Sequence, residues 1–220
     1  MSRKNESCYT KLAWFSKMNC CNYAAAVVLA GGKGSRMGYV EKALIMFDNT
    51  PLLTQTLRKL SQVVDTIVVA LRDDRQREDF SKLFPSVVFV TDQYHNIGPL
   101  AGIEVGLAAS NKEYTLVVGC DMPFINTEVI RYLLHKCRGF DVTIPRWSDG
   151  KLEPLHAVYR TSVIREEIGR CIKHGERFIL APVFKRKLVQ YIDVCELTKF
   201  DLTLDTFKNV NTETDVNSIV

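Results

Sequence analysis

The sequence predicts an α/β fold in which helices cover both faces of a mainly parallel sheet. From residue 23 onward, apolar segments of strand length alternate with amphipathic segments of helical length. The first apolar segment, Ala24–Ala30, contains no polar residue, as expected of a strand that is buried on both faces. Repeated strand–helix units build parallel sheets, because each helix returns the chain to the edge from which the strand started.

The expected elements follow one another without an internal repeat or a long linker. Further strands are expected at 66–71, 87–91, 114–119, 141–145, 156–160 and 188–194. Helices are expected over 50–64, with Thr50 as N-cap and Pro51 in the first turn, and over 73–83, 98–109, 126–137 and 162–173. A terminal helix is expected to begin at Thr212. We therefore predict a single domain over 23–220, preceded by a mobile N-terminal extension over 1–22.

Composition and charge exclude several classes of protein. The chain has 220 residues, of which 46% are apolar and 25% charged, which is typical of globular domains. The net charge is +4, but residues 1–22 hold four basic side chains and one acidic, and the rest hold 25 basic and 24 acidic. A nearly neutral body lacks the positive charge of a nucleic-acid binder. The longest apolar run, Tyr23–Ala30, is far shorter than the roughly 20 residues of a membrane helix, so we expect no membrane partner.

The cysteines indicate a reducing compartment. There are seven, and they form no CxxC pair and no Cys/His cluster with zinc spacing. The basic N-terminal segment lacks the apolar core of a secretory signal. We therefore expect reduced thiols in a cytoplasmic protein.

A glycine-rich turn follows the first strand and is the first candidate binding site. Ligands of such sheets bind beyond the carboxyl ends of the strands, and residues 31–38 (GGKGSRMG) lie there. Glycines let backbone N–H groups approach a phosphate, and Lys33, Arg36 and Lys42 add positive charge. The Walker pattern fails because a glycine follows Lys33, and the dinucleotide pattern fails because Met37 replaces its third glycine. The turn therefore favours a different phosphate site over a plain strand-to-helix connection.

Two aspartates end strands at the same predicted edge. Asp121 follows the strand at 114–119 and suits Mg²⁺, which prefers one or two carboxylates together with phosphate oxygens and waters. The alternative is a carboxylate that caps the following helix. Asp92 follows the strand at 87–91 and suits a nucleotide hydroxyl, the outer shell of the metal, or only a turn. The segment 98–102 (GPLAG) suits either a close approach to a base or second substrate, or only the start of a helix.

No histidine or cysteine stands out as a nucleophile. The four histidines (95, 135, 156 and 174) are scattered, and only His156 lies within a recognisable motif. We expect structural or peripheral roles for all four, and Cys120 is expected to be a small buried apolar residue.

Taken together, the motifs resemble those of the molybdenum cofactor guanylyltransferases over residues 24–217. The first and fourth motifs are shared with related nucleotidyltransferases, whereas the combination of all of them is more specific. In chain order they are LAGGKGSRMG (29–38), GYVEK (38–42), GPLAG (98–102), GCDMPF (119–124), EPLHAVYR (153–160) and NVNT (209–212).

The resemblance implies a three-layer, Rossmann-like nucleotidyltransferase fold and a Mg²⁺-dependent reaction. GMP passes from GTP to the terminal phosphate of molybdopterin that carries molybdenum, and pyrophosphate is released. GTP and molybdopterin are then the partners, with transient contact to other proteins of the cofactor pathway or to acceptor enzymes.

The resemblance also assigns roles to residues. The catalytic residues are Arg36, Lys42 and Asp121, with Asp121 on Mg²⁺ and Arg36 and Gly38 in the phosphate loop. The GTP site comprises Leu29, Ala30 and Gly31 on the guanine and ribose side, Lys42 on the triphosphate, and Asp92 and Asp121. The second substrate is assigned to Gly98, Gly102, Asn209 and Asn211. Two positions depart from the family pattern, because Glu41 replaces the usual aspartate before the lysine, and Ala70-Leu71-Arg72 stands where a polar asparagine is common.

Two other functions stay open at this point. One is a related nucleotidyltransferase that uses CTP or another NTP and acts on another cofactor or a sugar phosphate. The other is a non-catalytic nucleotide-binding protein of the same fold. An attacking phosphate is already ionised and needs no general base, which fits the lack of a histidine candidate.

Overall fold

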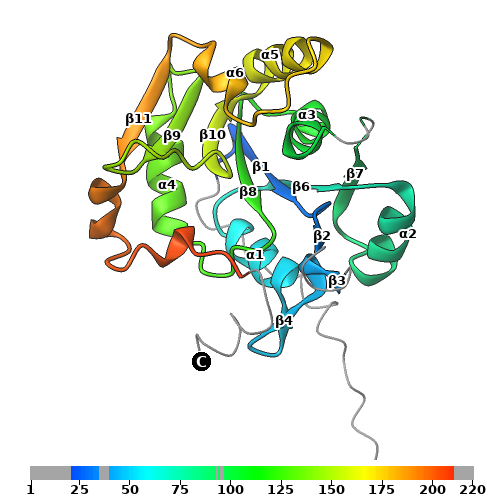
Figure 1. Ribbon diagram of the computed structural model, residues 1–220. Helices are drawn as coiled ribbons and strands as arrows, with labels where there is room; N and C mark the ends of the chain where they lie inside the picture. The colour runs from blue at the N-terminus through cyan, green and yellow to red at the C-terminus, as the bar shows by residue number, and fades with distance from the viewer. Residues whose placement is uncertain (1–20, 35–39, 93, 95–96, 211–220) are drawn as a thin grey trace, which may run out of the picture.

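The computed structural model describes residues 21–34, 40–92, 94 and 97–210, and these form one seven-stranded sheet between two layers of helices (Figure 1). The strand order is β11-β9-β10-β8-β1-β6-β7. Only the pairings of β10 with β8 and β9 are antiparallel, and all others in this sheet are parallel. The predicted α/β fold with a mainly parallel sheet is confirmed.

The strands lie close to where the apolar segments predicted them. They are β1 (Ala24–Leu29), β6 (Thr66–Leu71), β7 (Val88–Thr91), β8 (Tyr114–Gly119), β9 (Val142–Arg146), β10 (His156–Arg160) and β11 (Val189–Asp193). In β1, Ala26 and Val28 face one hydrophobic core and Val27 faces the other. Both faces of this strand are therefore buried, which explains why its sequence is apolar throughout.

Helices cover the sheet on both sides. One side carries α1 (Leu52–Leu60), α2 (Asp74–Leu83) and α4 (Thr127–Lys136), and the other carries α3 (Pro99–Ala109), α5 (Thr161–Lys173) and α6 (Ala181–Phe184). Figure 1 shows α3, α5 and α6 grouped together above the sheet. Within the described part of the chain, no helix is both long and apolar enough to cross a membrane.

The prediction that Thr50 caps the first helix is wrong. Thr50 pairs instead within a small hairpin formed by β4 (Met46–Phe47) and β5 (Thr50–Pro51). The two residues between these strands, Asp48 and Asn49, have φ values of 49° and 56°, and two left-handed residues are what a two-residue hairpin turn requires. Pro51 therefore takes the N-cap position, and α1 starts at Leu52.

Several short elements carry no signal in the sequence. Helix α1 ends at Leu60 rather than at residue 64, because the chain turns there with the N–H groups of Val63 and Val64 both bonded to the Leu60 carbonyl. The other short elements are β2 (Lys33–Gly34), β3 (Val40–Glu41) and the 3₁₀ helices η3 (Lys42–Leu44), η4 (Val194–Lys199) and η5 (Asp205–Phe207). Almost all of the expected N-terminal extension and the helix expected from Thr212 lie outside the described residues.

Helix α3 packs very closely against β1 and β6. A Cβ atom at Gly106 would lie 2.5 Å from the side chain of Val27, and one at Gly102 would lie 3.3 Å from that of Leu29. Small residues thus let the helix approach the sheet. Because α3 follows β7, its N-terminus lies at the carboxyl edge of the strands, beside the end of β1.

Candidate active site

The end of β1 and the end of β8 bring the two predicted motifs side by side. Leu29 is paired with Gly119, and the Leu29 carbonyl accepts a hydrogen bond of 3.1 Å from the N–H of Cys120. On the other side of β1, the Ala30 N–H donates to the Ala70 carbonyl at 2.9 Å. The glycine-rich turn and Asp121 therefore leave the sheet from neighbouring strands.

Lys42 and Asp121 meet at this edge across a gap of 79 residues in the sequence. The Lys42 Nζ lies 3.4 Å from the Asp121 Oδ2, and the two side chains are 24% and 18% exposed. Both charges are thus sheltered but still accessible. Such a pair can separate when a ligand arrives, with the ammonium on a phosphate and the carboxylate on a metal ion.

The position of the Asp121 carboxylate depends on Gly119. A Cβ atom at Gly119 would lie only 2.5 Å from the Asp121 Oδ1, so the carboxylate folds back into space that a side chain would fill. Helix α4 has its own cap, because the Asn126 Oδ1 accepts from the N–H of Glu128 at 2.9 Å. The alternative role of Asp121 as a helix cap is therefore already filled by Asn126.

The donor set fits a Mg²⁺ ion that arrives with a triphosphate. The described residues contain no group of three or more His, Cys, Asp or Glu side chains that could hold a metal. Mg²⁺ commonly binds one or two carboxylates and takes its other ligands from phosphates and water, and Asp121 can supply that carboxylate. Asp92 follows β7, three strands from β8, so strand spacing alone separates the two residues by about 14 Å. Asp92 and Asp121 therefore cannot bind the same ion. The Asp92 Oδ1 accepts a hydrogen bond of 2.6 Å from the Tyr94 N–H, as in the turn that was its alternative role.

The other predicted site residues surround this edge in different ways. Gly31 lies against the backbone that follows β6, because a Cβ atom at Gly31 would lie 2.9 Å from the backbone nitrogen of Arg72. Gly98 has a φ of 77° and is exposed directly before α3, whereas Gly102 packs on Leu29. Asn209 is exposed and precedes Val210, whose N–H bonds the Asp121 carbonyl at 2.8 Å. Arg36, Gly38 and Asn211 lie outside the described residues.

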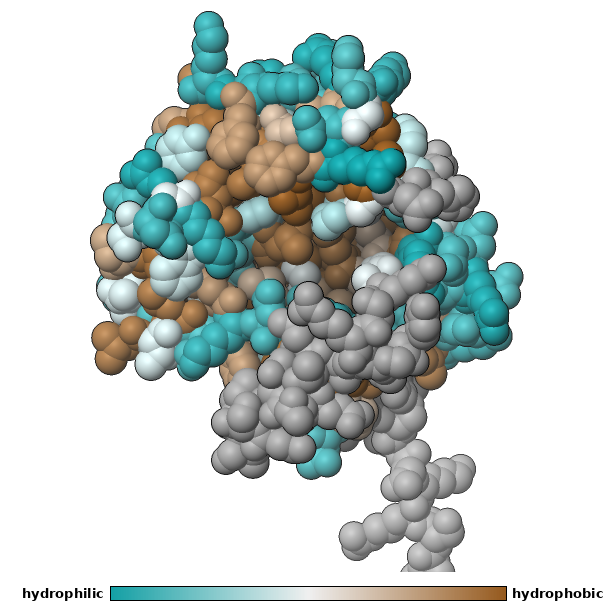
Figure 2. Space-filling view, in the orientation of Figure 1, coloured by the Kyte–Doolittle hydropathy of each residue, from teal (hydrophilic) through white to brown (hydrophobic). Residues whose placement is uncertain are grey.

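Figure 2 shows that the molecule is hollowed near the centre of this view, where β1, β8 and α3 come together in Figure 1. The floor of the hollow is mainly hydrophobic, and hydrophilic residues lie on its upper rim. A hollow with an apolar floor suits a ligand that carries a flat ring.

Gln76 is a buried residue beside the glycine-rich turn that sequence reasoning missed. Its side-chain Nε2 donates to the Ala30 carbonyl at 3.0 Å and to the Glu41 Oε2 at 2.7 Å. Arg72 donates to the other oxygen of Glu41 at 2.9 Å. Glu41 is thus bonded to Arg72, the last residue of the segment 70–72 that also departs from the family pattern. The only sequence signal is the spacing of Asp73 and Gln76, which matches a helix capping box.

Of the four histidines, the three that the structure describes lie in different surroundings. His156 is fully buried, its Nε2 lies 3.3 Å from the Thr206 Oγ1, and burial lowers its pKa to about 3. His135 and His174 are exposed, and His95 lies outside the described residues. Cys120 is buried, and burial raises the pKa of its thiol far above the usual range. Neither His156 nor Cys120 is therefore charged near neutral pH.

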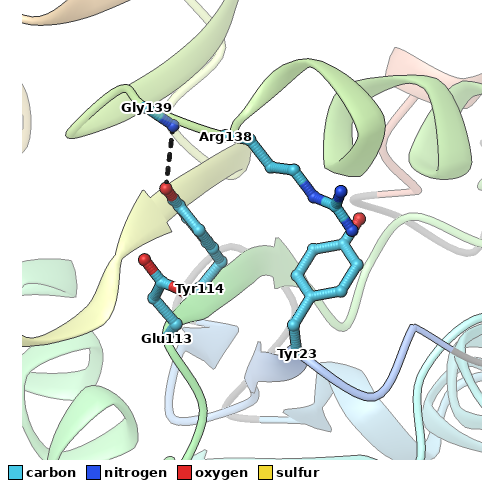
Figure 3. A pocket seen from close by; sticks show the side chains of 5 residues that line it. All are labelled: Tyr23, Glu113, Tyr114, Arg138 and Gly139. Carbon is cyan, nitrogen blue, oxygen red and sulfur yellow. Dashed lines mark hydrogen bonds between the residues drawn. The ribbon is translucent and has the colours of Figure 1, made fainter.

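A cavity of about 310 Å³ lies at the opposite edge of the sheet, where β1 and β8 begin (Figure 3). It is lined by Tyr23, Glu113, Tyr114, Arg138 and Gly139. In Figure 3 the Arg138 side chain reaches toward Tyr23, and Tyr114 points toward the backbone of Gly139. None of the predicted site residues lines this cavity.

Residues 26–190 match the MobA-like NTP transferase domain, which covers most of the chain. The chain belongs to the MobA-like NTP transferase family. A relative from Methanosarcina mazei named "Probable molybdenum cofactor guanylyltransferase" is 40% identical over 213 residues, which cover 93% of each chain. The predicted resemblance is thereby confirmed.

Solved structures of similar proteins agree with this membership. The molybdopterin-guanine dinucleotide biosynthesis protein A of Archaeoglobus fulgidus is 34% identical and superimposes with a TM-score of 0.76, covering 88% of this chain and 95% of its own. A 4-diphosphocytidyl-2C-methyl-D-erythritol synthase from Anaerococcus prevotii has a TM-score of 0.62 over 90% of this chain and 94% of its own. At 16% identity it shows that the fold is shared and nothing more. The predicted nucleotidyltransferase fold is thus confirmed.

Proposed function

We propose that this protein is a Mg²⁺-dependent guanylyltransferase that transfers GMP from GTP to molybdopterin carrying molybdenum. The names of its full-length relatives support the reaction. The observation that carries the proposal is the convergence of Lys42 and Asp121, 3.4 Å apart, where the glycine-rich turn meets β8. A cation and a carboxylate at this edge match the two requirements of a metal-bound triphosphate.

The reaction is an in-line displacement at the α-phosphorus of GTP. An oxygen of the molybdopterin phosphate forms a bond to that phosphorus, and the bond from the α-phosphorus to the bridging oxygen breaks. The electron pair of the broken bond leaves with pyrophosphate. The attacking oxygen is already ionised, so no side chain needs to remove a proton.

Bringing two anionic reactants together is the main obstacle, and the site offers charge to offset it. Lys42 would bind the triphosphate and stabilise the leaving pyrophosphate, together with N–H groups of the turn and with Arg36. When bound by Asp121, Mg²⁺ would neutralise phosphate charge and orient the reacting groups. Leu29, Ala30 and Gly31 would face the guanine and ribose, and Asp92 would contact a part of the nucleotide away from the metal.

The second substrate is assigned to the part of the carboxyl edge where residues 209–210 lie beside Asp121. Val210 bonds the Asp121 backbone, which supports a role for Asn209 close to the reacting phosphates. Gly98 is the N-cap of α3, and the positive end of the helix dipole there favours an anion. Gly102 and Asn211 complete the proposed set.

The proposed location is the cytoplasm, and the partners beyond the substrates are other proteins of the cofactor pathway or acceptor enzymes. The described cysteines (21, 120, 137, 171 and 195) are free thiols, which supports a reducing compartment.

The test is a panel of the four NTPs with Mg²⁺ and metal-loaded molybdopterin, followed by pyrophosphate release and mass analysis of the pterin product. We expect release only with GTP, and a product heavier by one GMP. A preference for CTP or ATP would favour the related nucleotidyltransferase. Bound GTP without a product would favour the non-catalytic binding protein.

A further inference from the structure

Gln76 uses its whole side-chain amide on the connections around the glycine-rich turn. It lies in the first turn of α2 and is 3% exposed. Its two donor bonds reach the Ala30 carbonyl and the Glu41 carboxylate, and its Oε1 accepts from the Arg72 N–H at 2.8 Å. A buried amide is costly unless it is bonded, and here both of its ends are bonded.

These bonds join the two ends of the turn. Ala30 is the residue from which the chain enters the turn, and Glu41 is where it leaves, one residue before Lys42. The ends also pair with each other, since Lys33–Gly34 and Val40–Glu41 form a short antiparallel ribbon. Gln76 therefore fixes the separation of both ends from a single buried point.

Glu41 acts as an anchor in this arrangement. One of its oxygens accepts from Arg72 and the other from Gln76, so both are engaged by protein groups. Arg72 is held in turn by Asp73, at 2.9 Å between Nε and Oδ2. The cluster ties the β6–α2 connection to the residue that precedes Lys42, and it leaves Asp121 as the carboxylate for the metal.

Anchoring α2 alone does not require these bonds. The helix already has an N-cap, because the Asp73 Oδ1 accepts from the Gln76 backbone N–H at 2.8 Å. It also has an apolar anchor in Phe80, which is buried against Phe84 and Phe89. The side-chain amide of Gln76 is directed at the turn, and a turn held in its binding geometry loses less entropy when a ligand binds.

We propose that Gln76 is a positioning residue that holds the two ends of the glycine-rich turn, at Ala30 and Glu41, and with them Lys42, in the geometry that binds the triphosphate of GTP. This inference rests on the proposed function. We therefore expect a change at Gln76 to raise the KM for GTP and to have little effect on kcat or on the KM for the pterin substrate.

The test is Gln76→Glu, which keeps the shape and the acceptor for Arg72 but removes both donors. It also places a carboxylate against Glu41. We expect the KM for GTP to rise at least about tenfold, with kcat within about threefold of wild type. Adding Glu41→Gln to this variant restores a donor–acceptor pair with reversed roles, and we expect it to recover part of the lost GTP affinity.

Two control variants on the same helix separate positioning from stability. Glu78→Gln makes the opposite carboxyl-to-amide exchange at an exposed position and should change nothing. Phe80→Leu removes buried apolar volume and should lower the melting temperature without changing the KM for GTP. If Gln76→Glu does not fold, Glu41→Ala removes the other side of the same bond and must raise the KM for GTP instead.

A wild-type KM for GTP in Gln76→Glu would overturn the inference, as would an equal rise in Phe80→Leu. The wild-type enzyme in the same assay distinguishes this from a failure of the proposed function. If the wild type transfers no GMP, the proposed function fails and the inference falls with it. If the wild type is active and Gln76→Glu keeps its KM, only the role of Gln76 is wrong.

Discussion

The two edges of the sheet at β1 and β8 are built from different chemistry. At the carboxyl edge, Lys42 and Asp121 face each other from distant segments across 3.4 Å. At the amino edge, a cavity of about 310 Å³ is lined by two tyrosines, Glu113, Arg138 and Gly139. The cavity is a hollow by shape, but the charged pair lies where ligands of parallel sheets bind.

The polar groups of the amino edge are already engaged within the protein. The Tyr114 hydroxyl accepts from the Gly139 N–H at 3.1 Å, and the Tyr23 hydroxyl donates to the Leu134 carbonyl at 3.1 Å. The Arg138 guanidinium lies over the Tyr23 ring, 4.6 Å from its centroid, and burial raises the pKa of Tyr23 to about 12. The two hydroxyls at the amino edge are thus bonded to backbone groups, whereas Lys42 and Asp121 at the carboxyl edge are bonded to each other and can each take a ligand group instead.

The largest expected effect is that of Asp121→Ala at the carboxyl edge. We expect turnover to fall at least a hundredfold, roughly the cost of losing one group that stabilises transition-state charge. The fold should stay intact, because the Asp121 side chain is not part of either large core. Pyrophosphate release and a thermal melt measure the two quantities. Wild-type turnover in this variant would show that the metal assignment is wrong.

Lys42→Ala, at the same edge, should reduce activity less than Asp121→Ala does. We expect kcat/KM for GTP to fall roughly 10- to 100-fold, because a charge-assisted bond to phosphate is lost. Lys42→Arg keeps the charge and serves as the matched variant, with a loss of intermediate size. Steady-state kinetics with GTP as the varied substrate provides the measurement. Unchanged kinetics in Lys42→Ala would remove this residue from the phosphate site.

Because His156 is buried, we expect it to make the free energy of unfolding, rather than the rate of GMP transfer, depend on pH. Burial lowers its pKa to about 3, from 6.5 for the free side chain. As the pH falls, His156 is therefore protonated in the unfolded chain before it is protonated in the folded one. Stability is therefore fully present above pH 6.5 and declines below it, by about 2 kcal/mol on reaching pH 5. In His156→Gln we expect this part of the decline to vanish in urea unfolding series at several pH values. An equally steep decline in the variant would assign it to other groups.

The smallest effect is expected at the amino edge. Arg138→Ala removes the cation over the Tyr23 ring, and we expect a loss of about 0.5–1 kcal/mol in unfolding free energy with no change in GTP kinetics. Denaturant unfolding and the pyrophosphate assay measure the two effects. A clear loss of activity in Arg138→Ala would contradict the claim that only the carboxyl edge takes part in the reaction, and it would make the cavity a second functional region.

The sequence predicts the sheet, and it predicts that the glycine-rich turn and Asp121 lie at one edge, because both follow from general properties of parallel sheets. A fully apolar run such as β1 signals a strand buried on both faces, and parallel strands bring their carboxyl ends to one edge. Lys42 and Asp121 could therefore be brought together without coordinates. Thr50 is not the cap that the sequence predicts, because the left-handed pair Asp48–Asn49 favours a hairpin, and a Thr-Pro dipeptide suits a strand end as well as a helix start.

Gln76 could not be predicted, for a physical reason. It lies in the polar segment DDRQRED, whose pattern is that of a solvated helix face. Its burial arises from contacts with Ala30 and Glu41, which are 46 and 35 residues away. Local periodicity carries no information about such contacts, so a buried polar side chain of this kind emerges only when the segments are folded together.

The most direct test of the account is the Mg²⁺ dependence of GTP binding, measured by calorimetry in the wild type and in Asp121→Asn. We predict that Mg²⁺ tightens GTP binding in the wild type and that this enhancement is lost in the variant, while binding without metal is retained. An equal Mg²⁺ enhancement in both proteins would contradict the claim that the glycine-rich turn and Asp121 hold one metal-bound triphosphate.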